Sequence, residues 1–225
     1  MSSELPITCQ PIKGESKHPI EKETTDQSNC LIIKNQSPVF ELIEEVYNSM
    51  ISNTLTNLTL WSKDLLDEGA EIIAKGIKQC KSLVNINLGY CKIRTRGIIA
   101  LADALENNKR IENLILGYNF PVILHHSLRE PPNEEVPESR AHIFNMANYI
   151  QGEGAIAIAK VIRTCPNLRT IALSYCHTTD SKDQEIILKA ISSSSIKEAY
   201  IWGYDKALTE EILSSNTNNL ISYTK

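Results

Sequence analysis

The stretch "LVNINLGYCKI" (Leu83–Ile93) decides the fold of this chain, because its pattern returns along the sequence. The segments "LTNLTLWSKDL" from Leu55 and "IENLILGYNF" from Ile111 follow the same pattern, and neighbouring segments start one 28-residue period apart. Apolar and polar residues alternate through each segment, which is typical of a short, half-buried strand. A chain that repeats one unit at a fixed period is predicted to stack its units side by side.

A fourth copy, "LRTIALSYCHT", starts at Leu168, which lies about two periods after Ile111 instead of one. One unit is therefore expected to carry an insertion about as long as one period, at about 120–148. The inserted segment is rich in Pro and Glu and predicts a long loop with one short helix over "SRAHIFNMA". A loop of this length is either functional or disordered, and the sequence leaves both interpretations open.

A degenerate unit is expected before the first clear copy. One period upstream of Leu55 lies Gln27, where "QSNCLIIKNQS" begins. This alignment places Cys30 and Ile32 at core positions of a strand and Asn35 at the bend that follows.

The last unit, "IKEAYIWGYDK", starts near Ile196 and allows two registers. If Ile196, Ala199 and Ile201 face the core, then Tyr200 and Trp202 lie on the opposite face. A slip of one residue would reverse every side chain and bury Trp202 instead. The first register is favoured because it keeps the I-x-x-A-x-I pattern of the repeat. About six units are expected in total.

The second half of each unit is predicted to be helical. Apolar residues recur there at i, i+3, i+4 and i+7, which gives each helix one apolar stripe. The stripes are Ala70, Ile73, Ala74 and Ile77; Ile98, Leu101, Ala102 and Leu105; and Ala155, Ile158, Ala159 and Ile162. A shorter stripe in the following unit contains Ile187, Leu188 and Ile191.

The helix openings "DEGAEIIAKGI" and "GEGAIAIAKVI", the 28-residue period and a position shared by Asn and Cys complete the pattern. In these features the chain resembles the leucine-rich repeat family, and most closely its ribonuclease-inhibitor-like class. The resemblance implies an α/β solenoid of about six repeats, curved like a horseshoe, with parallel strands on the concave side and helices on the convex side. It covers 27–225, and residues 1–26 are expected to form a disordered tail.

Asparagine and cysteine alternate at the ninth position of the unit, where the chain bends after the strand. The residues at this position are Asn35, Lys63, Cys91, Asn119 and Cys176. The resemblance implies that this side chain pairs with buried backbone groups of the bend, and Cys is small enough to replace Asn there. Lys63 departs from the pattern. Cys80 and Cys165 share another repeat position near a helix end, so the thiols are expected to be structural.

Residues between the apolar positions of the strands are expected on the concave face. The candidate partner-binding residues are Asn57, Trp61, Asn85, Asn87, Tyr90, Asn113, Tyr118, Tyr175, Tyr200 and Trp202. Tyr and Trp offer a large contact area with few rotatable bonds and are enriched at interfaces. The alternative is that the tyrosines only cover the strand ends and pack on one another.

Charge, hydropathy and motifs argue against several other functions. The net charge of −4 is unlike that of a nucleic-acid-binding surface, and the sequence has no apolar run long enough for a membrane span. Phosphate-loop, nucleophile-elbow and zinc-protease motifs are absent, so no catalytic residue and no cofactor is predicted. His125, His126 and His142 lack the spacing of metal ligands, so no metal site is predicted.

The expected function is that of a non-enzymatic, monomeric module that binds a protein partner through the concave face and the insertion. A cytoplasmic location is expected, because the first residues lack the apolar segment of a signal peptide. The alternative is regulation of a small GTPase, because Ran GTPase-activating proteins share this repeat class. The chain also resembles innate-immune repeat proteins and effectors that bacteria deliver to the host cytosol.

Overall fold

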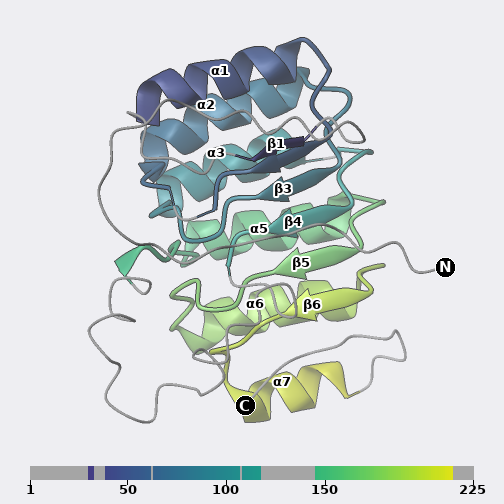
Figure 1. The fold of residues 1–225 in the computed structure, drawn as a ribbon. Helices are drawn as coiled ribbons and strands as arrows, with labels where there is room; N and C mark the ends of the chain where they lie inside the picture. Colours follow the sequence, from purple (N-terminus) through teal and green to yellow (C-terminus); the bar gives the residue numbers. More distant parts are fainter. Residues whose placement is uncertain (1–29, 33–38, 62, 107, 118–144, 215–225) are drawn as a thin grey trace, which may run out of the picture.

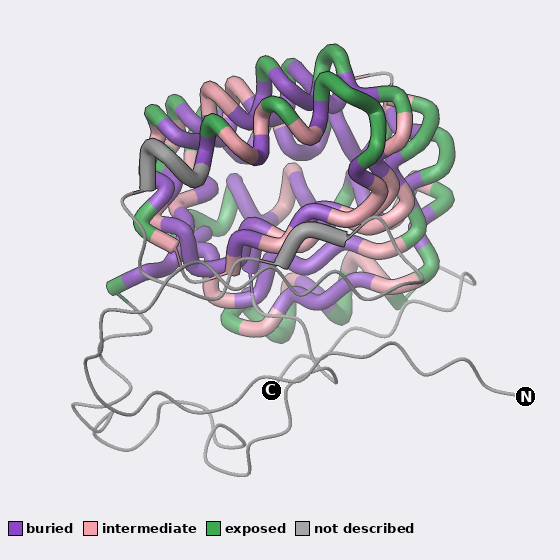
Figure 2. The backbone as a smooth tube through the Cα atoms, turned by 45° about the horizontal axis from the view of Figure 1, so that its top comes forward, coloured by how far each residue is buried: buried purple, intermediate pink, exposed green. Residues whose placement is uncertain are grey.

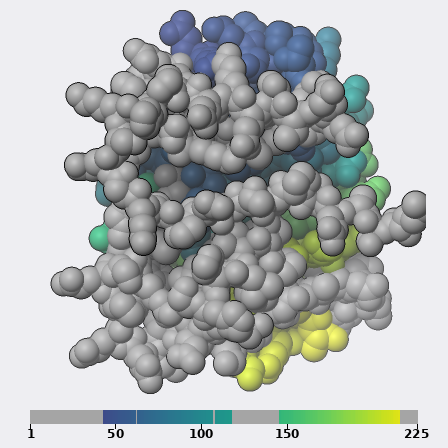
Figure 3. All heavy atoms as spheres, in the orientation of Figure 1, coloured from purple at the N-terminus to yellow at the C-terminus, as the bar shows by residue number. Residues whose placement is uncertain are grey.

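The computed structural model describes residues 30–32, 39–61, 63–106, 108–117 and 145–214, in which strands and helices alternate. The strands are β1 (Cys30–Ile32), β2 (Asn57–Thr59), β3 (Asn85–Asn87), β4 (Asn113–Ile115), β5 (Thr170–Ala172) and β6 (Glu198–Tyr200). The helices are α1 (Val39–Ile51), α2 (Leu66–Gln79), α3 (Thr95–Leu105), α5 (Glu153–Thr164), α6 (Ser181–Ser192) and α7 (Lys206–Leu213). The strands form one layer and the helices another, with α1 and α7 at opposite ends of the array (Figure 1). The purple-blue and yellow atoms at opposite ends of the space-filling view mark the same two ends (Figure 3).

All neighbouring strands of the sheet are parallel, and their order β1-β2-β3-β4-β5-β6 follows the chain. Parallel neighbours need a crossover connection, and the helices supply it. Asn57 lies opposite Asn85, and Asn85 lies opposite Asn113, so each step advances by one period of the sequence. Asn113 lies opposite Thr170, about two periods further along the chain. The pairing follows the 28-residue period from β2 to β4 and leaves about one extra period of chain between β4 and β5.

A column of buried leucines continues the backbone ladder just beyond the strands. Its members are Leu60, Leu88, Leu116 and Leu173, each at most 1 % exposed. Their N–H groups donate, in that order, to the carbonyl oxygens of Asn87, Ile115, Ala172 and Tyr200 in the next strand, over 2.8–2.9 Å. The predicted alignment of these four leucines is therefore confirmed.

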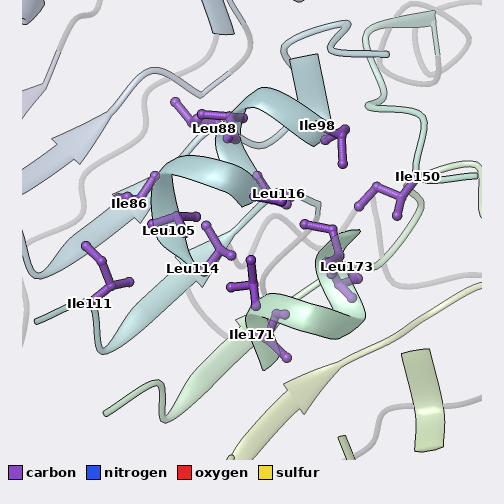
Figure 4. Packing of buried hydrophobic residues seen from close by; sticks show 14 of the residues in the cluster. Ile86, Leu88, Ile98, Leu105, Ile111, Leu114, Leu116, Ile150, Ile171 and Leu173 are labelled. Atoms are coloured by element: carbon purple, nitrogen blue, oxygen red, sulfur yellow. The ribbon is translucent and has the colours of Figure 1, made fainter. Parts of the chain in front are cut away.

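The core fills the space between the two layers, and exposed positions gather on the outer side of the helices (Figure 2). From the strands, Ile86, Leu114 and Ile171 contribute to it, and Leu105 of α3 packs beside them (Figure 4). Every residue of the predicted helical stripes is buried, so the stripes are confirmed. Burying one such aliphatic side chain contributes about 1.5–3 kcal/mol, which is why neighbouring units stabilise one another.

The register predicted for the first unit is wrong by one residue. Strand β1 forms where expected, but Cys30 lies opposite Asn57 and Leu31 lies opposite Leu58. The predicted alignment placed Cys30, instead of Leu31, at the position of Leu58. The run "CLII" is apolar at every position, so it lacks the alternation that would fix a register.

In the last unit the favoured register is confirmed. Ile196, Ala199 and Ile201 are all at most 1 % exposed, whereas Trp202 is only half-buried. Tyr200 lies on the other face of β6 from Ala199, as predicted, yet it is also buried.

The residue that occupies the bend of the insertion-bearing unit was predicted incorrectly. Asn148, not Asn119, holds this position, because its Oδ1 accepts the N–H groups of Cys91 and Ile93 at 3.2 and 2.9 Å. Its Nδ2 donates to the carbonyl oxygens of Leu88 and Leu116 at 2.7 and 2.6 Å. The insertion therefore falls before Asn148, directly after the strand turn, instead of after Asn119.

Several predictions fall outside the described residues. These are the tail 1–26, Asn35, Tyr118, most of the insertion, including its predicted short helix up to Phe144, and His125, His126 and His142.

Candidate functional site

The candidate site is the surface of the sheet that points away from the helices. In β2, β3 and β4 the middle residue is buried and the residues on either side are half-buried. Successive side chains of a strand point to opposite faces, so the flanking residues share the face opposite the helices. We call this surface the sheet face, and its residues are Asn57, Thr59, Asn85, Asn87, Asn113, Ile115, Thr170 and Glu198.

Three asparagines of the sheet face form a hydrogen-bonded row. The Nδ2 of Asn113 donates to the Oδ1 of Asn85, and the Nδ2 of Asn85 donates to the Oδ1 of Asn57. The row arises because identical side chains meet when strands one period apart pair in register. Each amide carries two N–H donors and two acceptor lone pairs, so the row keeps hydrogen-bonding capacity for a partner.

On the last two strands, β5 and β6, hydroxyl and carboxylate groups take the place of the asparagine amides. The hydroxyl of Thr170 donates to Glu198 Oε2 at 3.5 Å, and the hydroxyl of Tyr200 reaches the same oxygen at 3.5 Å. Ala172 and Tyr200 are buried here, in contrast to Asn87 at the matching position of β3. The half-exposed part of the sheet face therefore centres on β2, β3 and β4.

An aromatic pair borders the sheet face beyond β2 and β3. The rings of Trp61 and Tyr90 meet edge-on, with centroids 5.7 Å apart and planes at 70°. Tyr90 is only 4 % exposed and packs with Met146 and Ala147, which directly precede the bend residue Asn148. Trp61 is the half-exposed member, so it supplies the accessible surface of this pair.

Glycine occupies the position before the tyrosine in two units, because the backbones of neighbouring units approach each other closely there. A Cβ on Gly89 would lie 2.6 Å from the carbonyl oxygen of Gly117, and a Cβ on Gly117 would lie 2.7 Å from the backbone nitrogen of Ser174. Contacts of this length with backbone atoms exclude a side chain. The glycine of the "LGY" motif is therefore required by close packing against the backbone of the next unit.

A second aromatic group lies at the turns after β5 and β6. Residues 175–179 and 202–204 line a pocket of about 200 Å³ that includes Tyr175, Trp202 and Tyr204. Tyr175 and Tyr90 both have a positive φ, of 57° and 58°, which confirms that they occupy the same position of the repeat. The described aromatic residues near the strand turns thus include Trp61 with Tyr90 and Tyr175 with Trp202, whereas Tyr118, which the repeat places between them, lies outside the described residues.

Cys80, Cys91, Cys165 and Cys176 are buried and form no disulfide. The thiol of Cys91 donates to the carbonyl oxygen of Leu60 at 2.9 Å, and that of Cys165 donates to Leu105 at 2.9 Å. Burial raises the pKa of Cys165 to about 11 and the pKa of Cys176 further still. Both thiols stay protonated at neutral pH, where a nucleophile would need the thiolate.

Lysine occupies the bend position in the unit of β2. Lys63 is half-buried, and burial lowers the pKa of its ammonium group, an effect that the nearby Cys91 partly opposes. A long side chain can hold its charged end toward water while its stem packs in the bend. The unit keeps its strand and helix despite this departure from the repeat pattern.

Within the described part of the chain, no cluster of three or more His, Cys, Asp or Glu side chains is arranged to hold a metal ion. No helix in that part is long and apolar enough to cross a membrane.

Sequence reasoning missed two features of the site. Asn148 is separated from its strand by the insertion, so the repeat period could not align it with the other bend residues. The sequence feature that could have identified it is its separation from Cys91 by about two periods. The stack of Tyr149 on His177, with ring centroids 4.5 Å apart, was also missed. Both residues directly follow bend residues, which places them on adjacent turns.

Comparison with known proteins gives one short similarity. The chain is 35 % identical over 69 residues to the mouse "NACHT, LRR and PYD domains-containing protein 4E", a match that covers 30 % of this chain and 7 % of that protein. This chain therefore spans only a small part of its relative's length. No family model matches the chain. The similarity points to a relationship with leucine-rich repeat proteins.

Proposed function

We propose that this chain is a non-enzymatic interaction module that binds a protein partner through the sheet face. The observation that supports this best is the row of half-exposed side chains from Asn57 to Asn113, which extends over three strands and leaves the core to their buried neighbours. A continuous, rigid row of this kind suits an extended partner surface better than a small molecule.

The units are proposed to be leucine-rich repeats, six in number. The name of the mouse relative gives that protein such repeats, and Leu60, Leu88 and Leu116 of the buried column recur at the 28-residue period of this chain. Parallel strands lie about 4.8 Å apart, whereas helices with their side chains are about 10 Å wide. Two layers of unequal width bend the array, which would make the sheet face concave.

The chemistry of the sheet face suggests the kind of partner surface that it fits. Asparagine amides both donate and accept hydrogen bonds, and Trp61 offers an aromatic anchor beside them. The strands β2, β3 and β4 contribute no charged residue to this face. A partner surface with uncharged polar groups around one apolar residue would match it.

The test compares two variants in affinity purification followed by cross-linking and mass spectrometry. Thr59→Arg with Asn87→Arg places two bulky charges on the sheet face, whereas Ile156→Arg places one on the outer helix layer, where Ile156 is 51 % exposed. Partner recovery is expected to fall at least about tenfold only for the sheet-face variant, which corresponds to about 1.4 kcal/mol of binding free energy. Equal recovery with all three proteins would place the interface elsewhere.

A further inference from the structure

The pocket at the turns after β5 and β6 is lined mainly by aromatic side chains. Its volume of about 200 Å³ is below that of typical small-molecule sites and suits a single side chain. Tyr175, Trp202 and Tyr204 contribute three aromatic side chains to the lining. The ring of Tyr175 lies against Gly203, where a Cβ would be 3.6 Å from a ring carbon.

Several polar groups of the lining are already engaged within the protein. The hydroxyls of Tyr204 and Thr178 lie 3.4 Å apart, and the Nε2 of Gln151 lies 3.3 Å from the hydroxyl of Thr179. The thiol of Cys176 is directed to the carbonyl oxygen of Ser174 at 3.9 Å. A ligand that depends on several directional hydrogen bonds is therefore a poor fit, whereas one that binds to aromatic rings is favoured.

Two carboxylates adjoin the pocket. The described lining residues include no Lys, Arg, Asp or Glu, but Asp180 and Asp205 directly follow the lining residues Thr179 and Tyr204. Both aspartates cap helices, and each accepts a backbone N–H, at 2.7 and 2.8 Å. Lys206 follows Asp205, but its ammonium group lies 3.7 Å from Glu210 further along α7.

Tyr204 adds a neutral ring close to a carboxylate. Burial raises the pKa of its phenol well above the ordinary range, and the negative charge of Asp183 acts in the same direction. The ring therefore stays uncharged at neutral pH. The face of a neutral aromatic ring attracts a positive charge.

Near the pocket, a guanidinium group of this chain already lies over an aromatic ring. The Cζ of Arg94 lies 5.6 Å from the ring centroid of Tyr149, within the range of a cation–π contact. Tyr149 in turn stacks on His177, which lines the pocket. Aromatic groups thus continue from the exposed Arg94 to the lining residue His177.

We propose that this pocket binds the guanidinium side chain of an arginine from a protein partner. Aromatic residues and arginine are frequent anchors of protein interfaces, and the pocket would hold one such anchor beyond the edge of the sheet face. The proposal rests on the proposed function, because the arginine belongs to a protein partner. The probe experiment below needs no partner, so either proposal can fail without the other.

The test uses ¹⁹F NMR of the full chain labelled with 5-fluorotryptophan. Trp61 and Trp202 are the two tryptophans of the chain, so the spectrum has two signals, and Trp61→Leu assigns them. N-acetyl-arginine methylamide is titrated in parallel with its citrulline analogue, which has almost the same shape but no charge. The arginine compound is expected to shift the Trp202 signal saturably, leave Trp61 unmoved, and bind about fivefold to tenfold more tightly than citrulline.

A variant removes one ring without straining the backbone. Tyr175→Asn is chosen because asparagine tolerates the positive φ of 57° at this position, and circular dichroism checks its fold. The arginine-induced shift is expected to weaken at least fivefold in this variant, and Trp61→Leu should bind like the parent. Equal binding of citrulline, a shift at Trp61 instead of Trp202, or no saturable shift in the parent would each overturn the proposal.

Discussion

The side chain of Asn148 accepts the backbone N–H of Cys91 at 3.2 Å, although the whole insertion separates them in sequence. The same amide contacts the carbonyl oxygens of Leu88 and Leu116, so it joins two adjacent turns. Asn148 is 1 % exposed, and water therefore does not replace these bonds. One buried side chain closes the unit that the insertion interrupts.

Asn148→Ala is expected to destabilise the fold by about 3 kcal/mol or more. The substitution leaves several buried backbone groups without partners, and each such group costs about 1–3 kcal/mol. Urea denaturation followed by circular dichroism measures the change. Asn148→Cys serves as the matched variant and should lose less, because Cys91 and Cys176 occupy this position in other units. Equal losses for Ala and Cys would contradict a hydrogen-bonding role.

Truncation within the leucine column should cost about 2–5 kcal/mol per site. Leu88→Ala and Leu116→Ala each remove a side chain that is at most 1 % exposed and leave a cavity between strand and helix. Thermal melts and urea midpoints report the loss. Ile156→Ala on the exposed outer side of α5 is the control and should change stability by less than about 0.5 kcal/mol.

The period of the sequence was sufficient to predict the strand pairing from β2 to β6. Identical residues such as Asn57 and Asn85 mark the same position, and a stack of units with equal length must pair them. The period failed at β1, where "CLII" offers apolar residues to both faces. It also failed at the insertion, where the alignment assigned Asn119 to the bend that Asn148 closes.

The two aromatic groups could not be derived from the period. Repeat positions predict which side chains share a face, but they do not predict how deeply each is covered. Tyr90 is buried because Met146 and Ala147 pack on it, and these residues come from the end of an insertion without a repeat pattern. Tyr175 instead lines a pocket, although its backbone adopts the same conformation as that of Tyr90.

Gly117→Ala should destabilise the protein by about 1–3 kcal/mol. The added Cβ would lie 2.7 Å from the backbone nitrogen of Ser174 and closer still to its carbonyl oxygen, and neither atom can move without disturbing the neighbouring turn. Gly154→Ala is the matched control in α5, where a Cβ meets its nearest neighbour at 3.4 Å. That change should be neutral or stabilise the helix by up to about 1 kcal/mol. Similar losses at both glycines, measured by urea denaturation, would argue against the close approach.

Lys63→Met should make the protein more stable at neutral pH. Burial lowers the pKa of Lys63 from its ordinary value of 10.5, so folding disfavours the charged ammonium, and Met keeps a similar stem without the charge. Between the folded pKa and 10.5 the unfolded chain binds more protons, so the stability of the parent rises with pH in that window. The advantage of Lys63→Met over the parent should therefore be largest at neutral pH and shrink as the pH approaches 10.5. Urea midpoints of both proteins across this range measure the difference, with Lys78→Met on the exposed surface of α2 as the control for the loss of a surface lysine. An advantage that stays constant or grows with pH would mean that burial of the ammonium group does not limit stability at this bend.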